Sequence, residues 1–129
     1  MRLILFMFLI MSGFSMNVEA QTFVQGQKVL VAYFSRSGNT RAVAEYIQKL
    51  TGGDLIEIET SKPYPAEYHA CTVVAKKEKE EGVRPALKTK VENTGQYDLV
   101  FIGYPNWWGT MPMAVVTFLE GYDWTGKTL

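Results

Sequence analysis

Cysteine and histidine are almost absent from this chain of 129 residues. Each occurs once, as Cys71 and His69. A single cysteine cannot form an internal disulfide, so packing must stabilise the fold. A lone cysteine and a lone histidine also lack the further ligands, at suitable spacing, that a metal centre needs. We therefore predict no metal site, and we interpret Cys71 as a small core residue rather than as a nucleophile.

The sequence also lacks a net charge, because thirteen basic side chains balance thirteen acidic ones. A neutral chain has no basic field to attract nucleic acid and no polybasic segment to bind an anionic membrane. Internal repeats and low-complexity segments are absent as well. Apolar residues make up an ordinary 47%. Length and composition together favour one globular domain with a sizeable core.

The longest unbroken apolar run lies at the N-terminus, at 3–11. A basic residue precedes it, and two residues suited to a cleavage site, Val18 and Ala20, follow it. This layout is typical of a secretory signal peptide. It predicts a signal peptide at 1–20, a mature domain at 21–129, and export to the bacterial periplasm with no stable membrane span after cleavage. A membrane anchor is the alternative, although the run is shorter than the roughly 20 residues that span a bilayer.

Apolar patterns divide the rest of the chain into alternating strands and helices. The predicted elements are strand 28–34, helix 40–50, strand 55–59, helix 66–82, strand 97–104 and helix 113–122. Strands that alternate with helices across long connections form a parallel sheet covered on both faces. We therefore expect an α/β fold in which the two most apolar strands, the first and the third, are neighbours in the centre of the sheet. Residues 127–129 resemble the start of a further buried strand.

Two of these patterns predict which side chains face the core. In the first helix, Val43, Ile47 and Leu50 repeat with helical spacing and predict its buried face. In the second strand, Ile56 and Ile58 point to one face, while the glutamates next to them point to the other. Charged side chains along one face are typical of a strand at the edge of a sheet.

A small polar loop at 35–40 joins the first strand directly to the first helix. A loop in this position exposes the first N–H groups of the helix, which form an anion site together with the helix dipole. The loop adds hydroxyl and amide donors and a glycine that permits close approach, namely Ser35, Ser37, Gly38, Asn39 and Thr40. A phosphate monoester fits this set. The motifs for a nucleoside triphosphate and for a dinucleotide are both absent. Plain helix capping by these residues is the alternative.

Two adjacent tryptophans, Trp107 and Trp108, lie in a second loop of sequence PNWWGTMP at 105–112. This loop follows the carboxyl end of a central strand, where open α/β sheets bind ligands. Two neighbouring indoles in a loop rich in proline and glycine are hard to bury together. They predict an aromatic wall for a flat heterocycle. The alternative is that one indole packs on the domain while the other contacts a partner.

The motifs YFSRSGNT and YPNWWG occur in the order found in flavodoxin-like proteins, and the chain resembles that family of bacterial FMN-binding domains over residues 28–129. The resemblance implies a three-layer α/β/α sandwich, a parallel sheet in the order 2-1-3-4-5, and FMN as a non-covalent cofactor. It implies that the first loop holds the phosphate and that the second borders the ribityl chain and the isoalloxazine ring. The residues concerned are Ser35, Arg36, Ser37, Gly38, Asn39 and Thr40, then Pro105, Asn106, Trp107, Trp108 and Gly109.

The resemblance carries two further expectations about the ring. The peptide between Trp108 and Gly109 would turn its carbonyl toward the reduced flavin, a movement that glycine makes easy. Tyr64 would approach the ring edge, whereas Tyr33 has the alternative of simple strand packing. No side chain has to act as an acid, a base or a nucleophile, because the cofactor performs the electron chemistry.

The chain departs from the family in two respects. Many flavodoxins are strongly acidic, whereas this chain is neutral. The family also continues with two more strands, a third flavin-contacting loop and a closing helix, so we interpret the chain as truncated at its C-terminus and lacking these elements. The leading hypothesis is electron transfer through bound FMN, with a partner protein or a small-molecule acceptor. The alternatives are an NAD(P)H- or quinone-dependent reductase, a truncated fragment that binds no cofactor, and an exported module that binds sugars or peptides.

Overall fold

The computed structural model describes residues 24–129, so the predicted signal peptide lies outside the described residues. The elements are, in order, β1 (Val29–Tyr33), α2 (Asn39–Thr51), β2 (Asp54–Glu57), α3 (Tyr68–Glu81), the 3-10 turn η1 (Thr94–Gln96), β3 (Leu99–Gly103) and α4 (Met113–Glu120). Each strand and helix expected from the sequence is present, with ends displaced by one or two residues. None of the helices described is long and apolar enough to cross a membrane.

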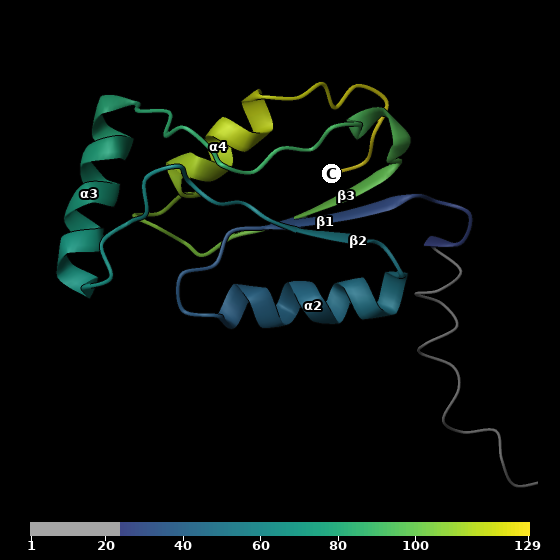
Figure 1. The fold of residues 1–129 in the computed structure, drawn as a ribbon, viewed down its shortest axis with the longest axis horizontal. Coiled ribbons are helices and arrows are strands. Elements are labelled where there is room, and N and C mark those ends of the chain that lie inside the picture. The colour runs from purple at the N-terminus through teal and green to yellow at the C-terminus, as the bar shows by residue number, and fades with distance from the viewer. Residues whose placement is uncertain (1–23) are drawn as a thin grey trace, which may run out of the picture.

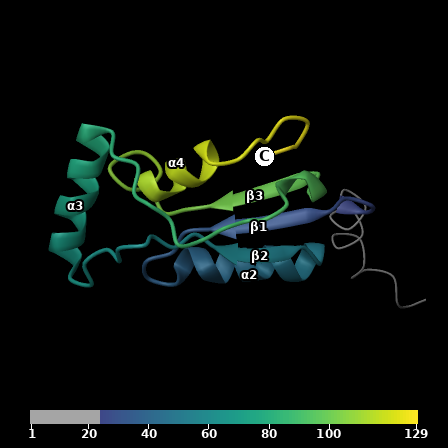
Figure 2. The same cartoon turned by 45° about the horizontal axis from the view of Figure 1, so that its top comes forward.

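The strands form an open parallel sheet in the order β2-β1-β3. Figure 1 shows α2 on one face of this sheet and α4 on the other. The view in Figure 2 confirms the layers and shows α3 beyond the carboxyl ends of the strands, beside the loops that leave them. The expected α/β fold is therefore confirmed, with β1 and β3 as neighbours and β2 at an edge.

The core consists of one apolar cluster on each face of the sheet. Every residue of β1 is buried, because alternate side chains point to opposite faces and both faces are covered. Leu30 and Ala32 pack with Phe118 on the α4 side. Val31 packs with Ala44 on the α2 side. Cys71 is buried, as the sequence predicts for a small core residue.

The predicted buried face of α2 is wrong in part. Ala44 is the buried residue of this helix, and Ile47 packs against the same cluster, whereas 60% of Val43 and 38% of Leu50 is exposed. Helical spacing fixes a period but not which stripe faces inward. Here the small Ala44 side chain lies against the sheet, and the helix is turned so that Val43 points away from it.

The second strand follows its predicted pattern. Ile58 is buried and Ile56 packs on the same cluster on the α4 side of the sheet. The Glu57 side chain points the other way and accepts hydrogen bonds from Arg41 of α2, with Nη2 to Oε1 and Oε2 distances of 2.7 and 2.8 Å. The C-terminal residues pair like the start of a strand, because Thr128 forms a parallel bridge with Leu99 beside β3. They are not buried as predicted, since 57% of Leu129 is exposed.

Candidate functional site

The two loops singled out in the sequence meet at the same end of the sheet. The Phe34 N–H, directly after β1, donates to the Gly103 carbonyl at the end of β3 over 2.9 Å. A Cβ placed on Gly103 would lie 3.2 Å from Cγ2 of Thr40, so the start of α2 packs closely on the end of β3. Parallel strands bring their carboxyl ends together, and the loops at 35–40 and 104–112 are therefore neighbours.

The first loop presents the start of a 13-residue helix without a side-chain cap. Gly38 precedes the helix with φ at 95°, a left-handed conformation that only glycine adopts freely. A Cβ on Gly38 would meet nothing within 4 Å, so the backbone is open to a ligand here. The Ser35 hydroxyl accepts from the Gly38 N–H over 3.1 Å and braces the turn. Because residues 35–40 carry donors and no carboxylate, the donor set fits a phosphate group.

Arg36 is the member of the first loop whose side chain donates a hydrogen bond to a residue outside the loop. Its Nη2 donates to the Ala66 carbonyl over 2.9 Å, and its guanidinium lies 5.4 Å from the ring centre of Tyr68. Both partners belong to the segment that begins α3. Arg36 therefore ties the first loop to α3, and its predicted role on the phosphate stays a prediction.

The second loop contains a tight two-residue turn at Trp108 and Gly109. The flanking residues exchange hydrogen bonds, from Trp107 N–H to the Thr110 carbonyl over 2.8 Å and back over 3.2 Å. Both central residues are left-handed, with φ of 52° at Trp108 and 80° at Gly109. Two positive φ values are characteristic of a type I′ turn. Among residues 24–129, Trp108 is the one residue other than glycine with a positive φ.

The two indoles point to different surroundings. Trp107 forms an edge-to-face cluster with Phe34 and Tyr64, in which ring centroids are 5.1 to 5.8 Å apart and ring planes lie at 85 to 88°. Such pairs contribute about 0.5–1.5 kcal/mol each beyond area burial. Trp108 instead packs on α3, where its Nε1 donates to the Thr72 carbonyl over 3.0 Å. Trp107 is therefore the indole that clusters with aromatic residues from other parts of the chain, and its role as a wall for a flat ring stays a prediction.

A cavity of about 810 Å³ opens beside this cluster. Of the residues predicted from the two motifs, Ser35, Arg36 and Trp107 line it. The others are on the two loops outside its wall: Ser37, Gly38, Asn39, Thr40, Pro105, Asn106, Trp108 and Gly109. The rest of the lining comes from Phe34, Glu57, Ile58, Glu59, Thr60, Ser61, Pro63, Tyr64, Pro65, Ala66 and Lys88.

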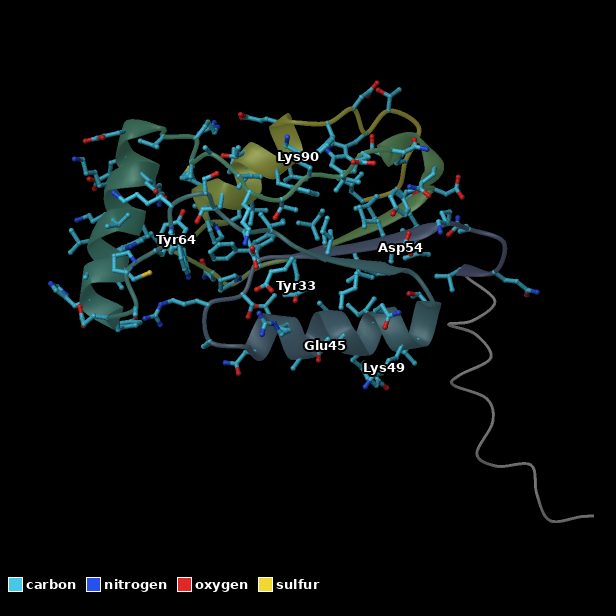
Figure 3. The ribbon with its side chains drawn as sticks, in the orientation of Figure 1. Tyr33, Glu45, Lys49, Asp54, Tyr64 and Lys90 are labelled. Carbon is cyan, nitrogen blue, oxygen red and sulfur yellow. The ribbon has the colours of Figure 1, made fainter. Side chains whose placement is uncertain are left out.

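Sequence reasoning missed Phe34 as a member of the site and treated it as strand packing. The available signal was its position, an aromatic residue immediately before the polar loop. Tyr64 lies beside Trp107, and its expected approach to the edge of the flavin ring stays a prediction. Figure 3 shows Tyr64 near α3, at the opposite end of the molecule from Asp54.

Tyr33 is buried on the α2 side, where its hydroxyl donates to Glu57 over 3.3 Å.

The two carboxylates that line the cavity are paired with basic side chains. The Glu57 carboxylate binds Arg41, and Glu59 forms an ion pair with Lys88 over 3.1 Å. The Tyr64 hydroxyl donates to Glu78 of α3 over 2.7 Å. Burial raises the pKa of the Tyr64 hydroxyl, with the hydrogen bond to Glu78 as a second cause. Burial likewise raises the pKa of the Glu78 carboxyl, more than its hydrogen bond lowers it.

An open parallel sheet with a phosphate-compatible loop and an aromatic loop at its carboxyl end defines a flavodoxin-like protein. The family model described as flavodoxin matches residues 28–129. The chain belongs to the flavodoxin family. Comparison with curated proteins gave no match.

Three solved structures show the same fold. A candidate flavoprotein from Bacteroides eggerthii is 41% identical with a TM-score of 0.69, and the match covers 78% of this chain and 66% of that one. A second from Bacteroides uniformis is 35% identical with a TM-score of 0.69, covering 80% and 69%. A flavoprotein from Lactobacillus acidophilus, solved in complex with FMN, is 27% identical with a TM-score of 0.64, covering 74% and 66%. The chain thus spans about two thirds of the length of these relatives.

Proposed function

We propose that this protein binds FMN non-covalently and transfers electrons through it. The observation that carries the proposal is the adjacency of the two loops, joined by the hydrogen bond from Phe34 to Gly103 and by the contact between the Phe34 and Trp107 rings. One small molecule with an anionic end and a flat aromatic end can touch both. The FMN complex of the Lactobacillus acidophilus relative supports the choice of ligand.

The first loop and the second loop would each bind a different part of FMN. Hydroxyls, the Asn39 amide and the free N–H groups at the start of α2 would hold the phosphate, because a helix N-terminus favours negative charge. Trp107, braced by Phe34 and Tyr64, would supply an apolar wall for the ring. When bound, FMN supplies the electron-transfer chemistry itself. The protein would orient the ring and shield it from water.

A reductase that passes electrons to a small molecule is the second candidate. The cavity beside Trp107 supports it, because about 810 Å³ lies within the range of sites that hold small ligands. We further propose, from the sequence pattern at 1–20, that the protein acts in the bacterial periplasm. The electron partner would then be another exported protein or a small molecule that reaches this compartment.

A titration of the full chain with FMN and with riboflavin tests the proposal. We expect FMN to bind with quenching of its fluorescence, and riboflavin to bind more weakly because it lacks the phosphate. The bound flavin should be reduced and reoxidised reversibly. A chain that keeps its circular dichroism spectrum but binds neither flavin would overturn the proposal and favour a fragment without a cofactor. Steady turnover of a quinone with NAD(P)H would favour the reductase over the carrier.

A further inference from the structure

Helix α3 contacts both loops of the proposed flavin site. Arg36 of the first loop contacts Tyr68, the first residue of the helix, and donates to Ala66 just before it. The middle and last turns of α3 hold Trp108 of the second loop. We propose that α3 positions the second loop for flavin binding and that Lys79 is the positioning residue. This inference rests on the proposed function and names the residue outside the two motifs that sets the shape of the site.

Three side-by-side positions on α3 hold Trp108. The Trp108 indole N–H donates to the Thr72 carbonyl over 3.0 Å, the Lys76 ammonium lies 5.4 Å from the centre of the indole ring, and the Lys79 ammonium donates to the Trp108 carbonyl. Residues 72, 76 and 79 are spaced i, i+4 and i+7, so they lie on one face of the helix. We call these three residues the α3 clamp.

Lys79 acts on the part of the loop whose backbone is unusual. Trp108 has φ at 52°, in the left-handed region that side chains with a Cβ rarely adopt. A residue in this conformation persists only when its surroundings hold it there. The Lys79 ammonium binds the carbonyl of this same residue, so it orients the peptide between Trp108 and Gly109. A charged donor makes one of the stronger hydrogen bonds available to a carbonyl.

The position of Trp108 determines that of its neighbour. Trp107 lies at the start of the turn and is paired with Thr110 across it. Holding Trp108 on α3 therefore directs Trp107 toward Phe34 and Tyr64 at the cavity. If the α3 clamp is weakened, the second loop populates other conformations part of the time. The apparent dissociation constant then rises in inverse proportion to the fraction of molecules whose loop keeps the binding conformation.

The experiment compares Lys79→Met with Lys77→Met in the full chain. Lys77 is an exposed lysine on the same helix, and no ion pair or side-chain hydrogen bond involves it among residues 24–129. Both substitutions remove one positive charge, but only Lys79→Met removes a contact with the second loop. Losing a hydrogen bond from a charged donor should raise the dissociation constant for FMN by about tenfold. Lys77→Met should stay within about twofold of the parent, the scale of an ordinary surface substitution.

Riboflavin separates a positioning role from a direct contact with the phosphate. Because Lys79 acts on the loop that borders the ring, Lys79→Met should weaken FMN and riboflavin by the same factor. Lys79→Arg, which keeps a charged donor, should recover most of the affinity for both. A loss confined to FMN would overturn the inference and place Lys79 on the phosphate instead.

A measurement without cofactor keeps this inference distinct from the proposed function. In the cofactor-free chain, amide hydrogen exchange at Trp107 and Thr110 reports whether the turn stays closed. Lys79→Met should speed exchange at these two amides and leave the amides of β1 unchanged, whereas Lys77→Met should change neither. If the parent binds no flavin but the exchange rates respond as expected, the proposed function fails and the α3 clamp stands. If exchange and affinity in Lys79→Met match the parent, the inference is overturned whether or not FMN binds.

Discussion

The ring centres of Phe34 and Trp107 lie 5.2 Å apart with their planes at 85°. Phe34 follows β1, and only 6% of its surface is exposed. Trp107 follows β3 and lines the cavity. This contact joins the buried core to the proposed flavin site. It also links two loops that are about seventy residues apart in the chain and that parallel pairing brings to one end of the sheet.

Replacing Trp107 should weaken flavin binding more than replacing a tryptophan elsewhere. Trp107→Ala removes the aromatic wall and should raise the dissociation constant for FMN by about tenfold, from lost stacking and lost apolar contact. Trp124→Phe is a control at a tryptophan outside the cavity lining, since Trp124 packs on Phe118 and Tyr122 instead. Fluorescence titration measures both. Identical constants for Trp107→Ala and the parent would remove Trp107 from the site.

Substitutions in the first loop should act through the phosphate. Gly38→Val forces a β-branched residue into the left-handed region, where Gly38 has φ at 95°. Thr40→Ala deletes one hydroxyl donor beside Gly103. Both should weaken FMN and leave riboflavin unchanged, because riboflavin has no phosphate to hold. Equal losses for the two ligands in Thr40→Ala would contradict the phosphate assignment.

The packing of α2 predicts opposite effects at two adjacent positions. Ala44 has 3% of its surface exposed and faces the sheet, so Ala44→Leu should lower the free energy of unfolding by about 1–3 kcal/mol through overpacking. Val43 is 60% exposed, and Val43→Ala should change the free energy of unfolding by no more than about 0.5 kcal/mol. Chemical denaturation measures both. A larger loss at Val43 than at Ala44 would show that the helix face derived from the sequence pattern is the correct one.

The hydrogen bond from Tyr64 to Glu78 predicts a pH-dependent change in stability. Tyr64→Phe leaves the carboxylate of Glu78 without its donor and should cost about 1 kcal/mol at neutral pH, the lower part of the usual range because Glu78 is partly solvated. Burial raises the pKa of Glu78 in the fold, so the stability linked to this group is present at acidic pH and is lost as pH rises through that pKa.

Removing the Tyr64 hydroxyl raises the pKa of Glu78 further, because the hydrogen bond lowers it. The difference between Tyr64→Phe and the parent should therefore shrink as pH falls through the raised pKa values of Glu78 in the two proteins, which lie above the ordinary pKa of glutamate, and should not change further below them. Tyr46→Phe, at a tyrosine that is 63% exposed on α2, is the control and should show no such trend. A difference that is constant with pH would mean that Glu78 does not ionise with this hydrogen bond in place.

Much of the fold followed from local patterns. The apolar run at 29–33 and the alternation around Ile56 and Ile58 predicted strands with the observed burial, because side-chain direction in a strand depends on the backbone alone. The meeting of the two loops also followed, since strands joined by helices run parallel. The expectation that Val43 lies on the buried face of α2 was wrong, since the rotation of a helix depends on what it packs against.

The roles of the paired tryptophans could not be read from the chain. Trp107 and Trp108 are chemically identical neighbours, and nothing local distinguishes them. The structure separates them because α3 comes back beside the second loop and binds one of them through Thr72 and Lys79. No sequence motif relates those residues to a loop about thirty positions further along.

The order of residues was thus sufficient to specify the strands and helices, a polar loop with a phosphate-compatible donor set, and an aromatic loop at the same end of the sheet. These features depend on backbone geometry and on chemistry within a few neighbouring residues. Tertiary packing alone settled which face of α2 is buried, which indole lines the cavity, and that Phe34 and α3 contact the two loops. Those outcomes depend on contacts between segments far apart in the chain, and such contacts exist only once the sheet has brought the segments together.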